Sequence, residues 1–233
     1  MTFKRNINGK LALGYGSKYN LLRMLGWHRN ELNTIVGDAI ECNPDHIKWL
    51  DFGYSGQFDD KEPMNFSFIN QDFNNEWLEY WQGGSRNDTG LNWDAIGKCD
   101  DTYILIEAKA HIEELDDKTG CGASQPARSI IEKRVKEFLA EHNIPFNKEH
   151  LGLDYQLMNR LVALSYLHKK GIKAELVYLL FVNGFENNRD KPKCASKEKL
   201  EEKMNTKLSR VGLTNAGLDN MVKVIYINAK KEK

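Results

Sequence analysis

The fold is decided by the stretch WDAIGKCDDTYILIEAKAH, residues Trp93–His111. Its two apolar segments, Trp93–Lys98 and Thr102–His111, are predicted to be strands separated by a tight turn at Cys99–Asp101. The first part of the second strand, from Tyr103 to Ile106, is apolar on both alternating faces, which is typical of a central strand. The spacing therefore predicts a hairpin whose second strand runs through the middle of a sheet.

The charged end of this second strand is the candidate chemical site. Glu107 and Lys109 are two residues apart, so in a strand both side chains point to one face and Ala108 points to the other. Opposite charges at the end of a buried strand are costly unless they are paired or bound to a metal. A hairpin turning near Asp100 would bring Asp94 of the first strand close to Glu107.

Two carboxylates and one main-chain carbonyl form an oxygen-rich group, which hard cations prefer. We expect Asp94, Glu107 and the carbonyl of Ala108 to bind Mg²⁺ or Mn²⁺, which polarises a phosphoryl oxygen and lowers the pKa of a bound water. Lys109 would orient that water or stabilise the charge that develops on the phosphate. The predicted reaction is hydrolysis of a phosphodiester. The alternative is a surface hairpin whose charges form a simple ion pair.

A helix and a buried strand are predicted downstream of this hairpin. Asp154 is placed to cap a helix over Asp154–Lys170, and Gly171 is placed to end it. The run Glu175–Asn183 is almost continuously apolar, which is typical of a strand covered on both faces. The buried face of the helix is predicted to consist of Leu157, Leu161, Leu164 and Leu167.

Polar side chains near these elements are candidates for contacting nucleic acid. Gln156, Asn159 and Arg160 share one helix face by their spacing, and an arginine there can give a phosphate two hydrogen bonds. The alternative is an ordinary solvated helix face. His111 shares the face of Lys109 if the strand continues, where it would bind phosphate or shuttle a proton; otherwise it caps the strand in solvent.

The remaining elements suggest a mixed sheet with helices on both faces, an α/β arrangement. Glu113 and Glu114 are expected to be solvated. The expected helices are Ser17–Gly26, His28–Ala39, Pro126–His142 and Ser196–Arg210, and the expected strands are Ile47–Tyr54, Asn65–Asn70 and Val222–Asn228, with Glu76–Trp81 as either a strand or a helical turn.

At these residues the sequence resembles the PD-(D/E)xK, or restriction-endonuclease-like, nuclease superfamily. The resemblance lies in Asp94 followed by Glu107-Ala108-Lys109 at the end of a hydrophobic strand, and it extends to about Asn183, less than half of the chain. It implies an α-β-β-β-α-β core with a mixed sheet and flanking helices. It also implies a divalent metal and a nucleic-acid substrate, with DNA preferred over RNA.

The chain departs from the pattern of that superfamily at one position and leaves another open. Trp93 stands where the motif has a proline before its first aspartate. Many members also place a glutamate on the first core helix, and Glu31 is the candidate for that role, with Glu76 as the second choice. A catalytically silent module that kept the fold and binds nucleic acid or a protein is the main alternative to an active nuclease. A structural or interaction protein with an accidental motif is a third.

The totals of the sequence bound these hypotheses. The chain has 233 residues with 41% hydrophobic and 28% charged residues, which suits one domain over residues 1–233, with residues 1–15 as a loose arm and 229–233 as a solvated tail. No apolar stretch approaches the roughly 18 residues of a membrane helix. A cytoplasmic protein without a membrane partner is therefore expected. The oligomeric state is open, and a homodimer is compatible with the sequence.

Charge and cysteine content argue against three classes of protein. The formal net charge is zero, which argues against coating nucleic acid with a broad basic surface but leaves room for a local cluster of lysine and arginine. No CxxC pair occurs, so neither a disulfide framework nor an isolated zinc site is expected. The four scattered cysteines are Cys42, Cys99, Cys121 and Cys194.

Overall fold

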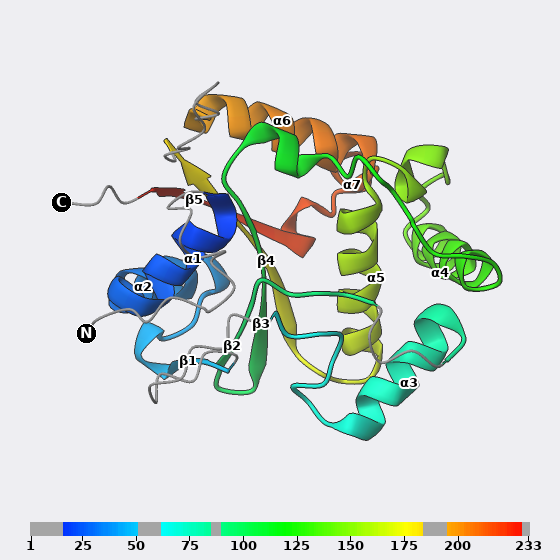
Figure 1. Cartoon of the computed structure of the whole chain (residues 1–233), viewed down its shortest axis with the longest axis horizontal. Helices are drawn as coiled ribbons and strands as arrows, with labels where there is room; N and C mark the ends of the chain where they lie inside the picture. Colours follow the sequence, from blue (N-terminus) through cyan, green and yellow to red (C-terminus); the bar gives the residue numbers. More distant parts are fainter. Residues whose placement is uncertain (1–15, 51–61, 85–89, 184–194, 230–233) are drawn as a thin grey trace.

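The computed structural model of the chain describes residues 16–50, 62–84, 90–183 and 195–229. Within these residues, one mixed sheet is covered by helices on both of its faces (Figure 1). The strands are β1 (Ile47–Trp49), β2 (Ala95–Cys99), β3 (Thr102–Lys109), β4 (Ala174–Val182) and β5 (Val222–Asn228). The helices are α1 (Gly16–Trp27), α2 (Arg29–Ile40), α3 (Gln71–Gln82), α4 (Ala127–Glu141), α5 (Tyr155–Lys169), α6 (Lys197–Arg210) and the short α7 (Leu213–Ala216).

The strands lie in the sheet in their chain order, β1-β2-β3-β4-β5. β1, β2 and β3 are antiparallel neighbours, whereas β3, β4 and β5 are parallel neighbours. Parallel neighbours need a crossover connection, and the helices α4, α5 and α6 lie within these connections. The hairpin β2–β3 and the central position of β3 are both as the sequence predicts.

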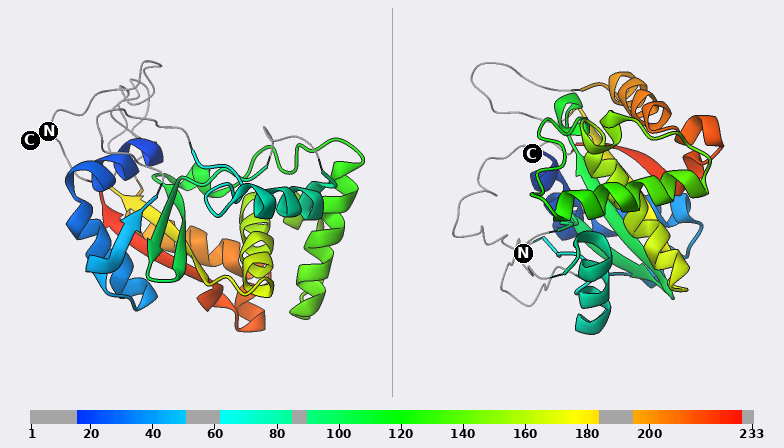
Figure 2. Two further views of the ribbon diagram at one scale, coloured as in Figure 1. Left: turned by 90° about the horizontal axis from the view of Figure 1, so that it is seen from below. Right: turned by 90° about the vertical axis from the view of Figure 1, so that its right-hand side faces the viewer.

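Each face of the sheet has its own apolar core, because side chains alternate along the strands. On β4, Val177, Leu179 and Phe181 pack with buried residues of α1 and α2. Leu176 and Leu180 of the same strand pack with α3, α4, α5 and α6 on the opposite face. Figure 2 shows the sheet between α1 and α2 on one side and α3, α4 and α5 on the other. The prediction of a strand buried on both faces is confirmed.

The helix α5 also forms as predicted. The leucines of its expected apolar face, Leu157, Leu161, Leu164 and Leu167, are all buried. Gly171 lies just beyond the helix with φ +75°, a left-handed conformation that glycine adopts without steric cost. The predicted capping role of Asp154 is wrong, because its side chain makes no capping hydrogen bond. Its carboxylate instead accepts hydrogen bonds from Lys207 and Arg210 of α6.

The region before the central hairpin differs most from the sequence prediction. Residues Asn65–Asn70, predicted as a hairpin strand, form turns that lead into α3. The side chain of Asn70 accepts a hydrogen bond from the Phe73 N–H and so caps α3. Glu76–Trp81, which the sequence predicts as either a strand or a helical turn, lies within the helix α3. Tertiary packing explains the difference, because the helix buries Trp77 and Trp81 against the sheet.

The other elements follow the sequence closely. α1, α2, α6 and β5 lie where they are expected, and the predicted helix from Pro126 begins one residue later as α4. The predicted strand Ile47–Tyr54 is regular only over Ile47–Trp49, and its last four residues, 51–54, lie outside the described part of the chain. The expected arm over residues 1–15, residues 230–233 of the expected tail, and Cys194 also lie outside it.

Candidate active site in an acidic cleft

The end of β3 presents its charged residues to one face of the sheet. Leu105 belongs to the core on the α5 face, and Glu107 contacts Arg160 of α5 on that same face. Lys109 contacts Glu107, while Ala108 packs in the opposite core with α1 and α2. The period of a strand therefore places Glu107 and Lys109 on one side and Ala108 on the other, as the spacing predicts.

The hairpin brings Asp94 to the same place. Asp94 directly precedes β2, in which Ala95 lies opposite Ile106 of β3. Its backbone N–H donates to the carbonyl of Ile106 at 3.1 Å, and its Oδ2 accepts a hydrogen bond from the Ala108 N–H at 2.6 Å. The Asp94 carboxyl thus takes the place of a backbone acceptor beside Ala108, and it lies next to Glu107.

Glu107 is the most enclosed charge of the group, with only 2% of its surface exposed. Its Oε1 contacts the Lys109 ammonium at 2.5 Å. Its Oε2 contacts Nη2 of Arg160 at 2.8 Å and accepts a hydrogen bond from Nε at 3.0 Å. A carboxylate buried to this degree is tolerated only when it is paired, and these two cations supply the pairing.

The same charges determine the proton affinities of the two carboxyl groups. Burial would raise the pKa of Glu107, but the attraction of Lys109 and Arg160 outweighs burial, so the pKa lies below its usual value. For Asp94, burial and then the negative charge of Glu107 dominate and raise the pKa from 3.8 to about 7. Asp94 thus holds its negative charge weakly at neutral pH, because burial and the charge of Glu107 outweigh the opposing attraction of Lys109.

A further polar group lies beneath this cluster. Tyr178 of β4 is directly opposite Glu107 of β3 in the register of the parallel pair, on the α5 face of the sheet. Its hydroxyl is fully buried and makes no hydrogen bond within the described residues. Burial, and then the nearby negative charge of Glu107, raise the pKa of this phenol well above its usual value. Tyr178 therefore stays neutral, and it adds a potential donor beside Glu107.

These residues line a cleft with a volume of about 630 Å³. Asp94, Glu107, Ala108 and Lys109 form part of its wall, and the start of α5 forms another part. The cleft is acidic, because seven carboxylates line it against only three lysine and arginine side chains. Such an excess of carboxylates attracts cations and repels a phosphate that arrives without one. The carboxylates are those of Glu62, Asp94, Glu107, Glu113, Glu114, Asp116 and Asp117.

The predicted polar face of α5 points into this cleft rather than into bulk solvent. Gln156, Asn159 and Arg160 all line it. Arg160 differs from the expectation of a phosphate ligand, because its guanidinium is already committed within the protein. Besides Glu107, it donates to the side chain of Asn159 at 2.7 Å and to the carbonyl of Asn92 at 2.5 Å. The geometry makes Arg160 the counter-ion of Glu107.

His111 also lines the cleft, but not as a continuation of the strand. β3 ends at Lys109, and His111 starts a short 3-10 helix, η3 (Ile112–Leu115). Nε2 of His111 lies 3.2 Å from Oε1 of Glu114, whose other oxygen accepts a hydrogen bond from the Ala110 N–H at 2.6 Å. The expectation that Glu114 is solvated is therefore wrong, whereas Glu113 is exposed as expected.

The glutamate expected from the first core helix is not brought to the cleft. Glu31 lies on the exposed surface of α2, 3.9 Å from His28, and it does not line the cleft. Glu76, the second candidate, pairs with Lys170 on an exposed surface of α3. Glu62 lines the cleft instead, and its negative charge contributes to the raised pKa of Asp94. No periodic pattern surrounds Glu62 in the sequence, so sequence reasoning had no signal for it.

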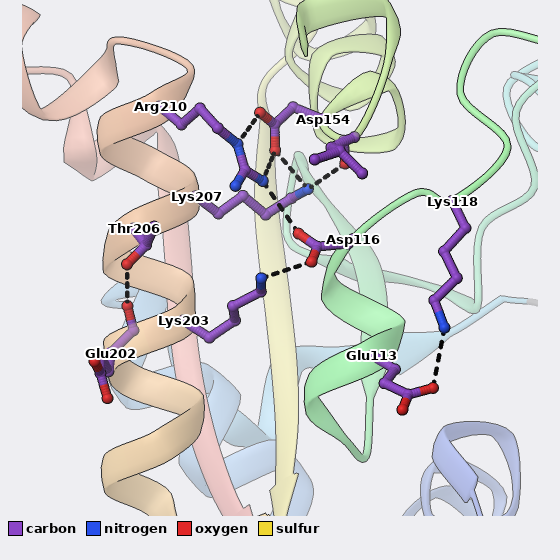
Figure 3. Close-up of polar contacts among 10 residues, drawn as sticks. Glu113, Asp116, Lys118, Asp154, Glu202, Lys203, Thr206, Lys207 and Arg210 are labelled. Carbon is purple, nitrogen blue, oxygen red and sulfur yellow. Dashed lines mark hydrogen bonds and ion pairs between the residues drawn. The ribbon is translucent and has the colours of Figure 1, made fainter.

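A second charged network holds the wall of the cleft in place (Figure 3). Asp154, just before α5, is fully buried. Its carboxylate forms ion pairs with Lys207 at 3.1 Å and with Arg210 at 2.6 Å. Arg210 also contacts Asp116 of the cleft wall at 3.1 Å, and Lys203 contacts the same carboxylate at 2.6 Å. Three cations from one face of α6 thus fix the segment after η3 and the start of α5.

The donor set suits a hard divalent cation held by few protein ligands. Within the described ranges, no group of three or more histidine, cysteine, aspartate or glutamate side chains is arranged to hold a metal ion. Asp94 and Glu107 provide two carboxylates, and the backbone of Ala108 lies between them in the cleft wall. Mg²⁺ is commonly bound by one or two carboxylates together with waters and substrate phosphates. Asp94 and Glu107 match this pattern of one or two carboxylate ligands.

Comparisons with family models, with curated proteins and with solved structures give no match for this chain. The residues of the cleft therefore provide the chemical basis for assigning a function. In the part of the chain that the structure describes, no helix has the length and apolar character needed to cross a membrane.

Proposed function

We propose that the protein is a metal-dependent nuclease that hydrolyses phosphodiester bonds in nucleic acid, with DNA as the expected substrate. The proposal rests chiefly on one observation. Asp94, Glu107 and Lys109 meet at the end of a central strand, on the wall of a cleft rich in carboxylates. Two carboxylates can hold a divalent cation that assists phosphodiester hydrolysis, and a lysine beside them can stabilise the negative charge that develops on the phosphate.

The order of the elements supports a restriction-endonuclease-like fold of the PD-(D/E)xK type. α2, β1, β2, β3, α5 and β4 follow one another as helix, three strands, helix and strand, with α3 and α4 inserted. The candidate residues lie on the β2–β3 hairpin of this series. The sequence resemblance implies an α-β-β-β-α-β core with this order of elements, so a restriction-endonuclease-like fold is part of the proposal.

The residues at the end of β3 and before β2 have the main chemical roles in the proposal. Asp94, Glu107 and the Ala108 carbonyl would hold Mg²⁺ or Mn²⁺. Such an ion, when bound, supplies Lewis-acid polarisation of a phosphoryl oxygen and a water of lowered pKa. Lys109 orients the attacking water or stabilises negative charge on the phosphate.

The polar side chains at the start of α5 would position the substrate. The amides of Gln156 and Asn159 face the cleft and can donate hydrogen bonds to a phosphate backbone. His111, whose Nε2 lies 3.2 Å from Oε1 of Glu114, also lines the cleft and would contact a neighbouring phosphate. Because the cleft carries excess negative charge, productive binding of a polyanion requires the cation.

The test is a cleavage assay on single-stranded, double-stranded and branched DNA and RNA, with and without Mg²⁺. Wild type should cleave at least one of these substrates only when Mg²⁺ is present. Asp94→Asn and Lys109→Ala should abolish cleavage while the protein stays folded. Glu31→Gln is the matched control, since Glu31 lies outside the cleft, and it should cleave like wild type. Equal cleavage by wild type and both cleft variants would refute the proposal.

A catalytically silent module that binds nucleic acid or a protein is the second candidate. One observation favours it: both oxygens of Glu107 are neutralised by Lys109 and Arg160, as in a structural ion pair. The same panel separates the two functions when binding is measured beside cleavage. Retained binding of a substrate without cleavage at any Mg²⁺ concentration would establish the silent module.

A further inference from the structure

We infer that a divalent cation and Lys109 compete for the same oxygen of Glu107, so that loading the site releases the Lys109 ammonium into the cleft. The inference rests on the proposed function for the cation itself. It adds a coupling that the proposed function does not contain. Lys109 would be free to meet a substrate only when the cation is present.

The two cations that neutralise Glu107 are held very differently. Arg160 is 4% exposed and makes contacts through all three of its nitrogens, to Glu107, Asn159 and the carbonyl of Asn92. Lys109 has Glu107 as its sole hydrogen-bonding partner among the described residues, and its side chain lines the cleft. Displacing Arg160 would break several buried contacts, whereas displacing Lys109 breaks one.

The cation and Lys109 compete for Oε1 of Glu107, because Arg160 contacts the other carboxylate oxygen. Lys109 is close enough to Asp94 to lower the pKa of that carboxyl. Lys109 thus interacts with both acidic groups, and its ammonium contacts Oε1 of Glu107. A cation shared by Asp94 and Glu107 needs one oxygen of Glu107, and Oε1 is the oxygen that Arg160 does not contact. Arg160 keeps Oε2 and fixes the orientation of the carboxylate, which makes it a positioning residue.

Displacement of Lys109 needs no rearrangement of the fold. The side chain lies at the wall of a cleft of about 630 Å³, so the ammonium has solvent-filled space to enter. The charge of Glu107 stays neutralised, because the cation replaces the ammonium at Oε1. Competition of this kind predicts that removing the lysine strengthens cation binding.

The test is calorimetric binding of Mn²⁺ to the whole chain, without any nucleic acid. Lys109→Met should bind Mn²⁺ at least about tenfold more tightly than wild type, because a charge-assisted hydrogen bond no longer competes. Arg160→Met should bind about 10- to 100-fold more weakly, because Glu107 loses its positioning contact. Opposite effects from two neighbouring cations separate competition from simple repulsion, which would strengthen binding in both variants.

A second measurement uses the wild-type protein and does not depend on how the variants fold. Acetylation of lysine amines, read by mass spectrometry, should increase at Lys109 when Mn²⁺ is added. Lys48, an exposed residue of β1 that does not line the cleft, is the internal control and should not change. Unchanged labelling of Lys109 with saturating Mn²⁺ would overturn the inference.

The outcomes distinguish this inference from the proposed function. Equal or weaker Mn²⁺ binding by Lys109→Met would overturn the competition and leave the nuclease proposal standing. Tighter binding together with no cleavage of any substrate would support the competition and overturn the nuclease proposal. Mn²⁺ binding by neither wild type nor Lys109→Met would overturn both.

Discussion

Replacing Asp94 with asparagine is predicted to stabilise the protein at alkaline pH and to flatten the dependence of stability on pH. In the folded protein the pKa of Asp94 is raised from 3.8 to about 7. The folded state therefore binds this proton more tightly than the unfolded state does. The sign follows from linkage: this contribution to stability is fully present below about pH 4 and is lost as the pH rises towards about 7.

The size of the effect comes from the same pKa values. Each tenfold change in proton affinity corresponds to about 1.4 kcal/mol, so the full loss is roughly 4 kcal/mol. This figure is an upper bound, because Asp94 lines the cleft and is partly open to solvent. Asparagine keeps an oxygen that accepts the Ala108 N–H, so the variant loses mainly the charge.

Urea unfolding at about pH 5 and about pH 8 measures this effect, with tryptophan fluorescence as the signal. Trp77, Trp81 and Trp93 are buried, so their emission reports unfolding. Wild type should lose stability between the two pH values, and Asp94→Asn should lose much less. Asp38→Asn, a change on the exposed surface of α2, is the control and should follow wild type. Equal pH dependence in wild type and Asp94→Asn would refute the assigned environment of Asp94.

Four further substitutions, in the charged networks near the cleft and in the core, are tested by urea unfolding. Glu107→Gln should destabilise the protein by about 3–5 kcal/mol, because two buried cations lose their counter-charge; an unchanged midpoint would contradict this. Asp154→Ala should cost about as much, whereas Lys207→Met should cost less than about 2 kcal/mol, because Arg210 still neutralises Asp154. Equal losses would show that Arg210 does not do so. Leu161→Ala should cost about 2–5 kcal/mol, and a loss below 1 kcal/mol would place Leu161 outside the core.

The parts of the fold that the sequence predicts are those with strong local patterns. The apolar run of β4, the leucine spacing of α5 and the turn between β2 and β3 each involve residues that are close in sequence. The hairpin also places Asp94 near Glu107, because only a short turn separates their strands. Local periodicity and turn residues were sufficient for these elements.

The parts that the sequence does not predict depend on contacts between distant segments. The pairing of Arg160 with Glu107 joins residues 53 positions apart, and it converts an expected phosphate ligand into a counter-ion. The Arg210–Asp154 pair spans 56 positions and removes the expected helix cap. The alternation of Phe66 and Phe68 imitates a strand, but the aromatic packing of α3 favours turns there. In each case tertiary contacts outweigh the local pattern.

The most direct test of the central claim is an anomalous diffraction measurement on crystals of the protein soaked in Mn²⁺. The account predicts an anomalous peak within about 2.5 Å of a carboxylate oxygen of both Asp94 and Glu107. The same peak should be absent from crystals of the Glu107→Gln variant. A peak next to other carboxylates of the cleft, for example Glu113 or Asp117, would contradict the account. The absence of any peak from the wild-type crystals would contradict it as well.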